Sequence, residues 1–205
     1  MIVPIVEGQS EALAIGVLIR RVLHDVERFD VEVARPFRVK RQKVVRAGEL
    51  ERTIAQAERS RPGATALLVV LDADQDCPAL VGQELRTRGE AHTNLRVCVV
   101  LPKVESEAWI LAGVDSVRGV RGIRGDAQAP VDPEAVRDAK GALTRLMEGT
   151  RGYVATDDQP AFFDRIDLDL VAARSPSFVK FRRDVASISC SPGPPAAQPS
   201  TDGGL

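Results

Sequence analysis

The sequence of 205 residues contains few cysteines and no long apolar segment. Its three cysteines, Cys77, Cys98 and Cys190, lie far apart and form no Cys-x-x-Cys pair. A disulfide framework or a zinc site is therefore not expected, and a reducing cytoplasm fits this usage. The apolar runs have the length of strands and fall short of the roughly 18 residues that cross a bilayer. Residues 1–8 contain no basic region before a long apolar stretch, so we expect neither a secretory signal nor a membrane partner.

The composition is that of a soluble globular protein, with 44% hydrophobic and 28% charged residues. This mixture excludes a fibrous or wholly disordered chain. The 28 basic and 29 acidic residues give a net charge of -1, so the total charge indicates no partner and only local clusters can.

Short apolar runs alternate with segments of helical period along the first half of the chain. We expect helices at residues 10–26, 48–59, 79–88 and 103–112, and strands at residues 2–6, 30–34, 66–71 and 95–101. This alternation predicts an α/β fold with a mostly parallel sheet of about four strands and helices on both faces. The runs at residues 2–6 and 66–71 are apolar on both faces, so we expect them to be adjacent interior strands.

The second half of the chain differs from the first half in its composition and in its pattern of predicted elements. Residues 114–130 are rich in glycine and arginine and predict a loop, and Asp132, Pro133 and Glu134 predict the start of a helix that ends near residue 147. A connection at residues 149–155 precedes helices at residues 160–173 and 178–188. We expect a core at 1–113, a helical extension packed on it at 114–189 and a disordered, proline-rich tail at 190–205.

Acidic side chains follow three of the predicted strands. Because the carboxyl ends of parallel strands meet at one edge of a sheet, we expect these acids to gather there. Crowded carboxylates raise one another's pKa unless a cation neutralises them, and hard oxygen ligands suit Mg²⁺ or Mn²⁺. Two such ions about 4 Å apart are a common device for phosphodiester cleavage. The candidate metal ligands are Glu7, Glu11, Asp72, Asp74, Asp76, Glu105 and Glu107.

Each part of this pattern has a simpler explanation. The Asp72-x-Asp74-x-Asp76 run also begins a calcium-loop pattern, but Cys77 stands where that loop needs glycine and Gln83 where it needs glutamate. A haloacid-dehalogenase-type phosphatase would want threonine or valine at position 76. An exposed acidic loop remains an alternative, so the metal-site prediction depends on the combination.

Two groups of basic residues are candidates for contact with nucleic acid. Residues 35–46 contain six basic residues and no acid, and the second group is spaced by glycines in the predicted loop. Positive charge beside an acidic metal site could hold a phosphate backbone. The alternative is a solvated surface or a docking face for an acidic protein. The candidate contacts are Arg35, Arg38, Lys40, Arg41, Lys43, Arg118, Arg121 and Arg124.

Six segments of the sequence resemble a Toprim-like family catalogued as domain of unknown function 4276, which is related to the overcoming-lysogenisation-defect (OLD) nucleases. The segments are VEGQSE at 6–11, LDADQDCPAL at 71–80, VESEAWILAG at 104–113, DAKGALTRLM at 138–147, GYVATDDQPAF at 152–162 and SPSFVKF at 175–181. The resemblance implies a Toprim-like fold and a Mg²⁺- or Mn²⁺-dependent nuclease acting on DNA or RNA, with a role in bacterial defence. Its implied catalytic residues are Glu7, Asp72, Asp74 and Lys140, and a solvated helix face is the alternative for Lys140.

Related proteins often work with an ATPase. Because the sequence has no Walker A pattern, the resemblance implies that any ATPase is a separate polypeptide. The second hypothesis is therefore a non-catalytic or conditionally active subunit of an ATPase complex. The sequence does not decide between a monomer and a homodimer.

Overall fold

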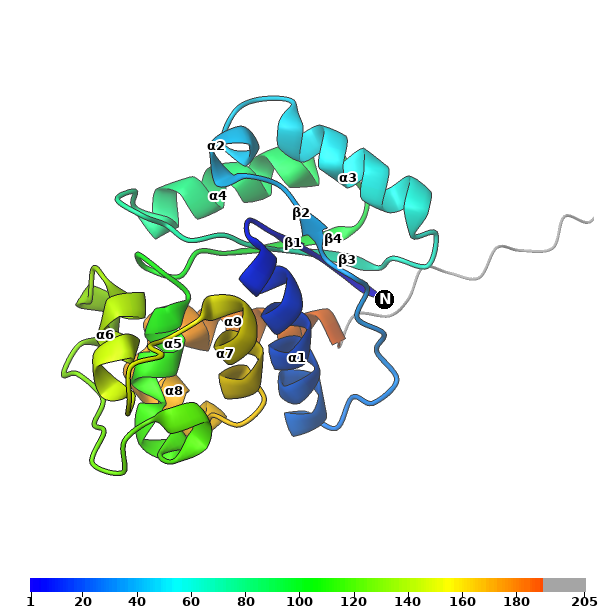
Figure 1. Ribbon diagram of the computed structural model, residues 1–205. Helices are drawn as coiled ribbons and strands as arrows, with labels where there is room; N and C mark the ends of the chain where they lie inside the picture. Colours follow the sequence, from blue (N-terminus) through cyan, green and yellow to red (C-terminus); the bar gives the residue numbers. More distant parts are fainter. Residues whose placement is uncertain (190–205) are drawn as a thin grey trace, which may run out of the picture.

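The computed structural model describes residues 1–189, and the predicted tail at 190–205 lies outside the described residues. Within the described part, four strands form one parallel sheet in the order β2-β1-β3-β4 (Figure 1). The strands are β1 (Ile2–Val6), β2 (Phe37–Arg38), β3 (Ala66–Val70) and β4 (Arg96–Val100). The helices are α1 (Gln9–Asp25), α2 (Arg41–Val44), α3 (Glu49–Ser60), α4 (Pro78–Glu90), α5 (Glu107–Ala112), α6 (Ala139–Leu146), α7 (Ala155–Phe163), α8 (Leu168–Arg174) and α9 (Pro176–Ser189). The predicted α/β fold is confirmed.

Helices cover both faces of the sheet. In Figure 1, α2, α3 and α4 lie on one side, and α1 and α5 to α9 lie on the other. The alternation of side chains along each strand divides the core accordingly, because Val3 and Ile5 pack under α3 whereas Ile2 and Val6 pack against α1 and the C-terminal helices. Both β1 and β3 are interior strands and buried at every position, as predicted. The larger core also holds Trp109, which contacts three phenylalanine rings.

The second predicted strand, at residues 30–34, is wrong. The chain runs parallel to the beginning of β1 there, where Val33 makes only an isolated bridge to Ile2, and the strand itself is Phe37–Arg38. Pro36 intervenes, and a proline interrupts a ladder because it has no N–H to donate.

Three of the predicted helices begin or end elsewhere. The helix at 103–112 begins only at Glu107, after a loop that contains Val104 at a φ of 65°. The helix at 132–147 is a 3-10 turn (Pro133–Ala135) followed by α6, because Asp132 and Asp138 each cap a separate start. The helix at 160–173 is split into α7 and α8, because Asp167 caps α8.

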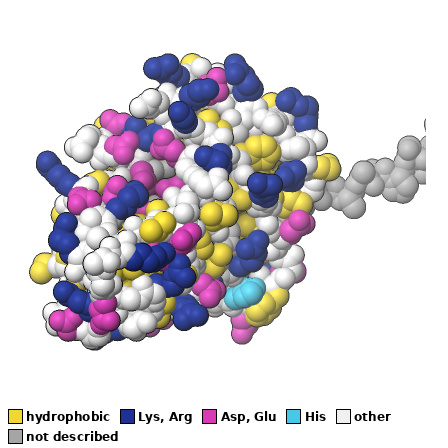
Figure 2. All heavy atoms as spheres, viewed as in Figure 1, with side chains coloured by type: hydrophobic (Ala, Val, Ile, Leu, Met, Phe, Trp, Pro, Cys, Tyr) yellow, Lys and Arg dark blue, Asp and Glu magenta, His cyan; other side chains and the backbone are white. Residues whose placement is uncertain are grey.

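The loop predicted at 114–130 contains two 3-10 turns (Val114–Val117 and Val120–Gly122). The described residues contain no helix of the length and apolarity that a membrane crossing requires. Figure 2 shows acidic side chains gathered on the side of the molecule at which the strands end, and the candidate site lies there.

Candidate functional site

Four carboxylates and one lysine, from four parts of the chain, gather at the carboxyl edge of the sheet. Asp72 lies two residues after β3, Glu105 and Glu107 lie after β4, and Glu11 is in the first turn of α1. Lys140, from α6, places its Nζ 2.9 Å from Glu105 Oε1 and 3.3 Å from Glu107 Oε2. We call Glu11, Asp72, Glu105 and Glu107 the acidic cluster. The sequence predicted these four acids and Lys140 as candidate site residues, and the structure brings them together.

Asp72 is held in the acidic cluster by the chain that follows β4. Its Oδ1 accepts a hydrogen bond from the Ser106 amide at 2.9 Å. Burial, together with the charges of Glu107 and Glu11, raises the pKa of Asp72 well above its ordinary value, and this outweighs the opposing effects of Lys140 and the amide. The carboxylate form of Asp72 is therefore costly unless additional positive charge arrives.

Glu107 contributes a fully buried carboxylate to the acidic cluster. Its side chain is fully buried, and its Oε1 accepts a hydrogen bond from the Tyr153 hydroxyl at 3.2 Å. Its Oε2 lies within ion-pair distance of Lys140 but accepts no hydrogen bond from the described residues. Burial raises the pKa of Glu107, although Lys140 opposes this shift. A buried oxygen that lacks a hydrogen-bond donor is suited to a cation or an ordered water.

Lys140 remains charged in this setting. Burial disfavours its ammonium form, but the neighbouring Glu107, Glu105 and Asp72 carboxylates more than compensate and raise the pKa of Lys140 above its ordinary value. Glu105 in turn accepts the Ala139 amide at 3.0 Å, which ties the start of α6 to the cluster. The lysine is thus a fixed counter-charge, whereas the sequence alternative was a solvated helix face.

The glycine at position 8, which follows Glu7 at the end of β1, is explained by steric space. A Cβ added to Gly8 would lie 2.2 Å from Glu11 Oε2, so any larger residue would displace the Glu11 carboxylate. Glu7 is half-buried, and because Val6 pairs with Val70, it lies level with Leu71, one residue before Asp72. The turn therefore allows Glu11 to fold back over the end of the strand.

Asp74 and Asp76 do not join the acidic cluster. Both pair with Arg41 on the other side of the loop, with Asp74 Oδ2 3.6 Å from Arg41 Nη1. Their side chains are mostly exposed, at 61% and 53%. The sequence placed them with Asp72 because all three follow the same strand at the carboxyl edge of the sheet, but the chain turns at Asp74, which has a φ of 52°.

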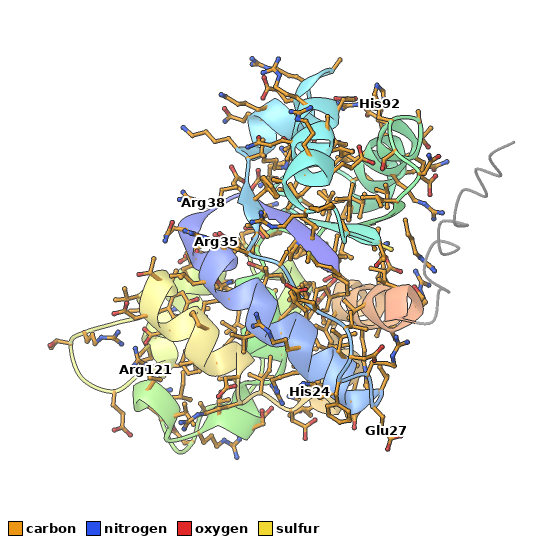
Figure 3. All side chains as sticks on the ribbon, turned by 90° about the vertical axis from the view of Figure 1, so that its right-hand side faces the viewer. His24, Glu27, Arg35, Arg38, His92 and Arg121 are labelled. Carbon is orange, nitrogen blue, oxygen red and sulfur yellow. The ribbon has the colours of Figure 1, made fainter. Side chains whose placement is uncertain are left out.

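The two predicted basic groups differ in how free they are to bind a phosphate. Arg35, Lys40 and Lys43 are exposed, and Arg38 is exposed with its guanidinium on Gln9 Oε1 at 2.6 Å, beside the Glu7-Gly8 turn. Figure 3 shows Arg35 and Arg38 near one end of α1, well separated from Arg121. Arg41 differs from the predicted nucleic-acid contact, because it is buried and forms ion pairs with Asp74 and Asp76.

The second basic group is committed to contacts within the protein, which does not favour the predicted phosphate role. Arg118 bonds to the Ala127 carbonyl and to Asp115. Arg121 donates to the fully buried Asp158 at 2.9 Å, and Arg124 pairs with Asp126 at 3.2 Å. These arginines fasten the loop of residues 114–130 to itself and to α7.

Three further site residues were not predicted from the sequence. Tyr153 holds Glu107, the Ser106 amide holds Asp72, and Gln159 donates to the Ser106 hydroxyl at 3.1 Å. Gln159 is fully buried, and its Oε1 has no hydrogen-bond partner among the described residues. The one available signal was that Tyr153 is the single tyrosine of the chain and lies in a segment that carries the family resemblance.

The acidic cluster is not a preformed metal cage. Among residues 1–189, no three His, Cys, Asp or Glu side chains are already arranged to hold an ion. The chemistry of the donor set nevertheless fits a hard divalent cation, because it consists of carboxylates and includes Glu107 Oε2, which accepts no hydrogen bond within the described part of the chain. The carboxylates would have to rotate before they could complete a coordination shell.

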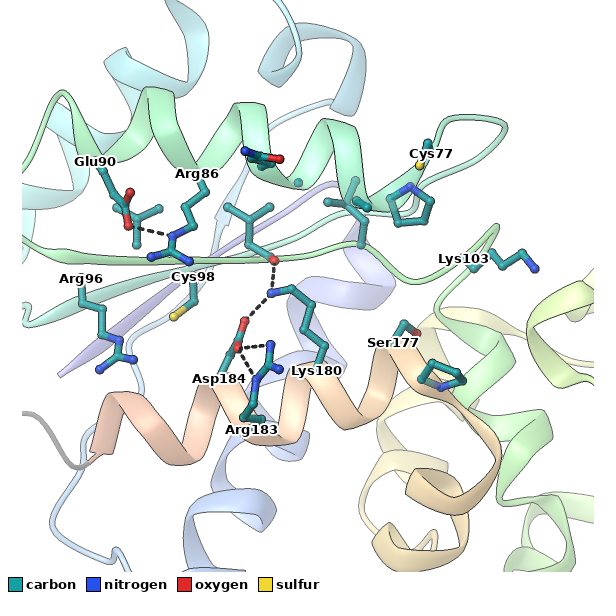
Figure 4. A pocket seen from close by; sticks show the side chains of 18 of the residues that line it. Cys77, Arg86, Glu90, Arg96, Cys98, Lys103, Ser177, Lys180, Arg183 and Asp184 are labelled. Carbon is teal, nitrogen blue, oxygen red and sulfur yellow. Dashed lines mark hydrogen bonds and ion pairs between the residues drawn. The ribbon is translucent and has the colours of Figure 1, made fainter.

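A separate hollow of about 950 Å³ lies between α4 and α9, beside the outer edge of β4 (Figure 4). Lys180 Nζ donates to the Val99 carbonyl at 2.7 Å there, and Arg86 pairs with Glu90. Long basic side chains thus cover the edge strand, a usual protection against pairing with another strand. None of the predicted acids lines this hollow in the described part of the chain.

The sequence profile of one protein family matches residues 6–186, which is most of the chain. The chain belongs to the family described as domain of unknown function (DUF4276). No curated protein and no solved structure matches it. The match spans both the sheet and the C-terminal helices, so it includes Asp72 and Glu107 as well as Lys140 and Tyr153.

Proposed function

We propose that this DUF4276 protein is a Mg²⁺- or Mn²⁺-dependent phosphodiesterase that acts on nucleic acid and is related to the Toprim domains of OLD nucleases. The observation that carries the proposal is the buried acidic cluster, in which Glu107 Oε2 accepts no hydrogen bond from residues 1–189 and Asp72 has a raised pKa. Such an arrangement costs stability without a cation, and strongly perturbed carboxyl groups often mark functional sites.

The ligands proposed for the ion are Asp72 and Glu107, with Glu7 and Glu11 on the β1 side. A bound divalent ion lowers the pKa of water and stabilises a developing oxyanion, which is what phosphodiester hydrolysis requires. One ion could be held by the cluster after side-chain rotation. A second ion would need Asp74, and Asp74 would first have to leave Arg41.

Lys140 and the exposed cations have separate proposed roles. The Lys140 ammonium lies between Glu105 and Glu107, so it is placed to offset negative charge on a phosphoryl group at the cluster. Arg35, Arg38, Lys40 and Lys43 flank the end of β1 and are proposed to hold the phosphate backbone. We further propose that a separately encoded ATPase is the protein partner, in a role in bacterial defence.

The test is cleavage of plasmid DNA and single-stranded RNA with Mg²⁺ or Mn²⁺, with and without an ATPase encoded next to this protein. Glu107→Gln keeps the shape of the side chain but removes its charge, and we expect at least a 100-fold loss of cleavage. Glu90→Gln, an exposed acid paired with Arg86, is the matched control and should retain activity.

Two results would count against the proposal. Equal cleavage by the wild type and Glu107→Gln would assign the activity to another site or to a contaminant. No cleavage under any condition, with an ATPase complex that Glu107→Gln still forms, would favour the non-catalytic subunit instead.

A further inference from the structure

All three guanidinium nitrogens of Arg41 contact the short acidic loop of residues 72–76. It is 8% exposed, although it belongs to the most basic segment of the chain. Its Nε donates to the Asp72 carbonyl at 2.8 Å, and its Nη2 donates to the Ala73 carbonyl at 3.2 Å. The same Nη2 contacts the Asp76 carboxylate, and Nη1 pairs with Asp74. An arginine that binds phosphate needs guanidinium donors that are accessible at the surface, so these contacts do not favour the predicted phosphate role of Arg41.

The loop that Arg41 holds is strained and is fixed from its other side as well. Asp74 has a φ of 52°, and its amide donates at 3.3 Å to the carbonyl of Val104, which itself has a φ of 65°. Positive φ is costly for both residue types and persists only where the surroundings enforce it. Arg41 enforces it from the β2–α2 side, and Val104 enforces it from the loop before α5.

We infer that Arg41 is a positioning residue for the metal-binding carboxylate of Asp72. By holding the Asp72 and Ala73 carbonyls it fixes where the Asp72 side chain projects, and by pairing with Asp74 and Asp76 it keeps two further negative charges out of the acidic cluster. The role assigned to Asp72 rests on the proposed function, whereas the clamp itself does not.

Only an arginine can make this set of contacts. Its planar fork presents donors in two directions at once, so one side chain can bind two carbonyls and a carboxylate together. A lysine at position 41 keeps the charge but cannot span these acceptors. Arg41→Lys is therefore a sharp test, because it separates the geometry of the clamp from its charge.

The experiment compares Arg41→Lys with the wild type and with Arg86→Lys, which changes an exposed arginine of an ion pair far from the loop. Two quantities are measured in the full chain: Mn²⁺ affinity by calorimetry, and hydrogen exchange of the loop amides at 72–76 without metal. Arg41→Lys should weaken Mn²⁺ binding by about tenfold, as loss of an outer-shell partner usually does, and should speed the loop exchange. Arg86→Lys should change neither.

The outcomes separate the possible roles of Arg41. A lower melting temperature with wild-type Mn²⁺ affinity and loop exchange would overturn the inference in favour of a purely structural role. Weaker DNA binding with wild-type Mn²⁺ affinity and exchange would overturn it in favour of a phosphate contact. If the wild type binds no Mn²⁺, the proposed function fails, and the exchange comparison alone then decides whether the clamp exists.

A second variant covers the case in which Arg41→Lys does not fold. Asp76→Asn removes one partner of Arg41 and leaves both carbonyl bonds in place. It should speed exchange at 72–76 and weaken Mn²⁺ binding by about threefold, less than an outer-shell deletion. Wild-type behaviour in both measurements would overturn the inference.

Discussion

Lys140 Nζ lies 3.3 Å from Glu107 Oε2, a fully buried oxygen that accepts no hydrogen bond from the described residues. The lysine therefore offsets the charge of Glu107 without donating a hydrogen bond to its Oε2. An ammonium group supplies one positive charge to the neighbouring Glu107, Glu105 and Asp72 carboxylates, and the pKa is raised for both Asp72 and Glu107. The acidic cluster is thus partly compensated in the metal-free protein and has capacity for a further cation.

Lys140→Met should destabilise the metal-free protein in a pH-dependent way. Lys140 lowers the pKa of Glu107, so its loss raises that pKa further. A carboxyl group whose pKa is raised by folding costs stability increasingly as pH rises through that pKa. The deficit should be small near pH 5 and about 1–2 kcal/mol at pH 8, a partly exposed ion pair being worth less than a buried one. Urea unfolding from pH 5 to pH 8 checks this, with the exposed Lys103→Met as control. A deficit that does not change with pH would contradict it.

Asp72→Asn should stabilise the metal-free protein while weakening Mn²⁺ binding. The pKa of Asp72 is raised in the folded protein, so its charged form is disfavoured there and the cost to stability grows as pH rises from the unfolded pKa through the folded pKa. Asparagine removes the charge and can still accept the Ser106 amide through Oδ1. We expect a gain of about 1 kcal/mol near pH 8 that shrinks toward pH 4. The control is Asp126→Asn on an exposed loop, and a melting temperature below that of the wild type would contradict the prediction.

The sequence predicted the sheet and the position of the site because both follow from local patterns. The all-apolar runs at 2–6 and 66–71 identified interior strands, and the acids directly after them fell at one edge. What it could not predict depends on contacts between distant residues. Arg41 and Asp76 are 35 positions apart, so nothing in their own segments distinguishes a clamp from a phosphate contact. Caps such as Asp138, which begin a new helix inside a predicted one, depend similarly on geometry that polarity alone does not determine.

Glu51 should make the free energy of unfolding decrease at low pH. Its hydrogen bond from Arg88 lowers the pKa of Glu51 from 4.5 to about 2, and its Oε2 also accepts the Gly48 amide at the start of α3. A carboxyl group whose pKa is lower in the folded protein stabilises the fold at any pH above its unfolded-state pKa. This stabilisation is lost as pH falls through the folded-state pKa. Glu51→Gln should therefore cost about 2–3 kcal/mol at pH 7 and much less near pH 2.5. The control is Glu49→Gln, whose partner Arg52 is largely exposed, and an equal loss in both variants would contradict the account.

Val104 should be a site at which glycine is better than alanine. Its φ of 65° is unfavourable for any residue with a Cβ, and its carbonyl must accept the Asp74 amide in this conformation. Val104→Gly and Val104→Ala both remove the valine methyl groups, so the pair isolates the backbone term. We expect the glycine variant to be more stable than the alanine variant by about 1 kcal/mol in urea unfolding. An alanine variant of equal or greater stability would show that the loop is not strained.

The most direct test of the central claim is a crystal structure of the protein soaked in Mn²⁺, with the ion located by its anomalous signal. We predict a peak about 2.0–2.3 Å from carboxylate oxygens of Asp72 and Glu107, the usual range for small divalent ions. Glu107 Oε2, which accepts no hydrogen bond in the described part of the chain, should be one of these oxygens, and the Arg41 contacts to Asp74 and Asp76 should remain. A peak at Asp74 and Asp76 alone, or no peak at millimolar Mn²⁺, would contradict the assignment of the acidic cluster as a metal site.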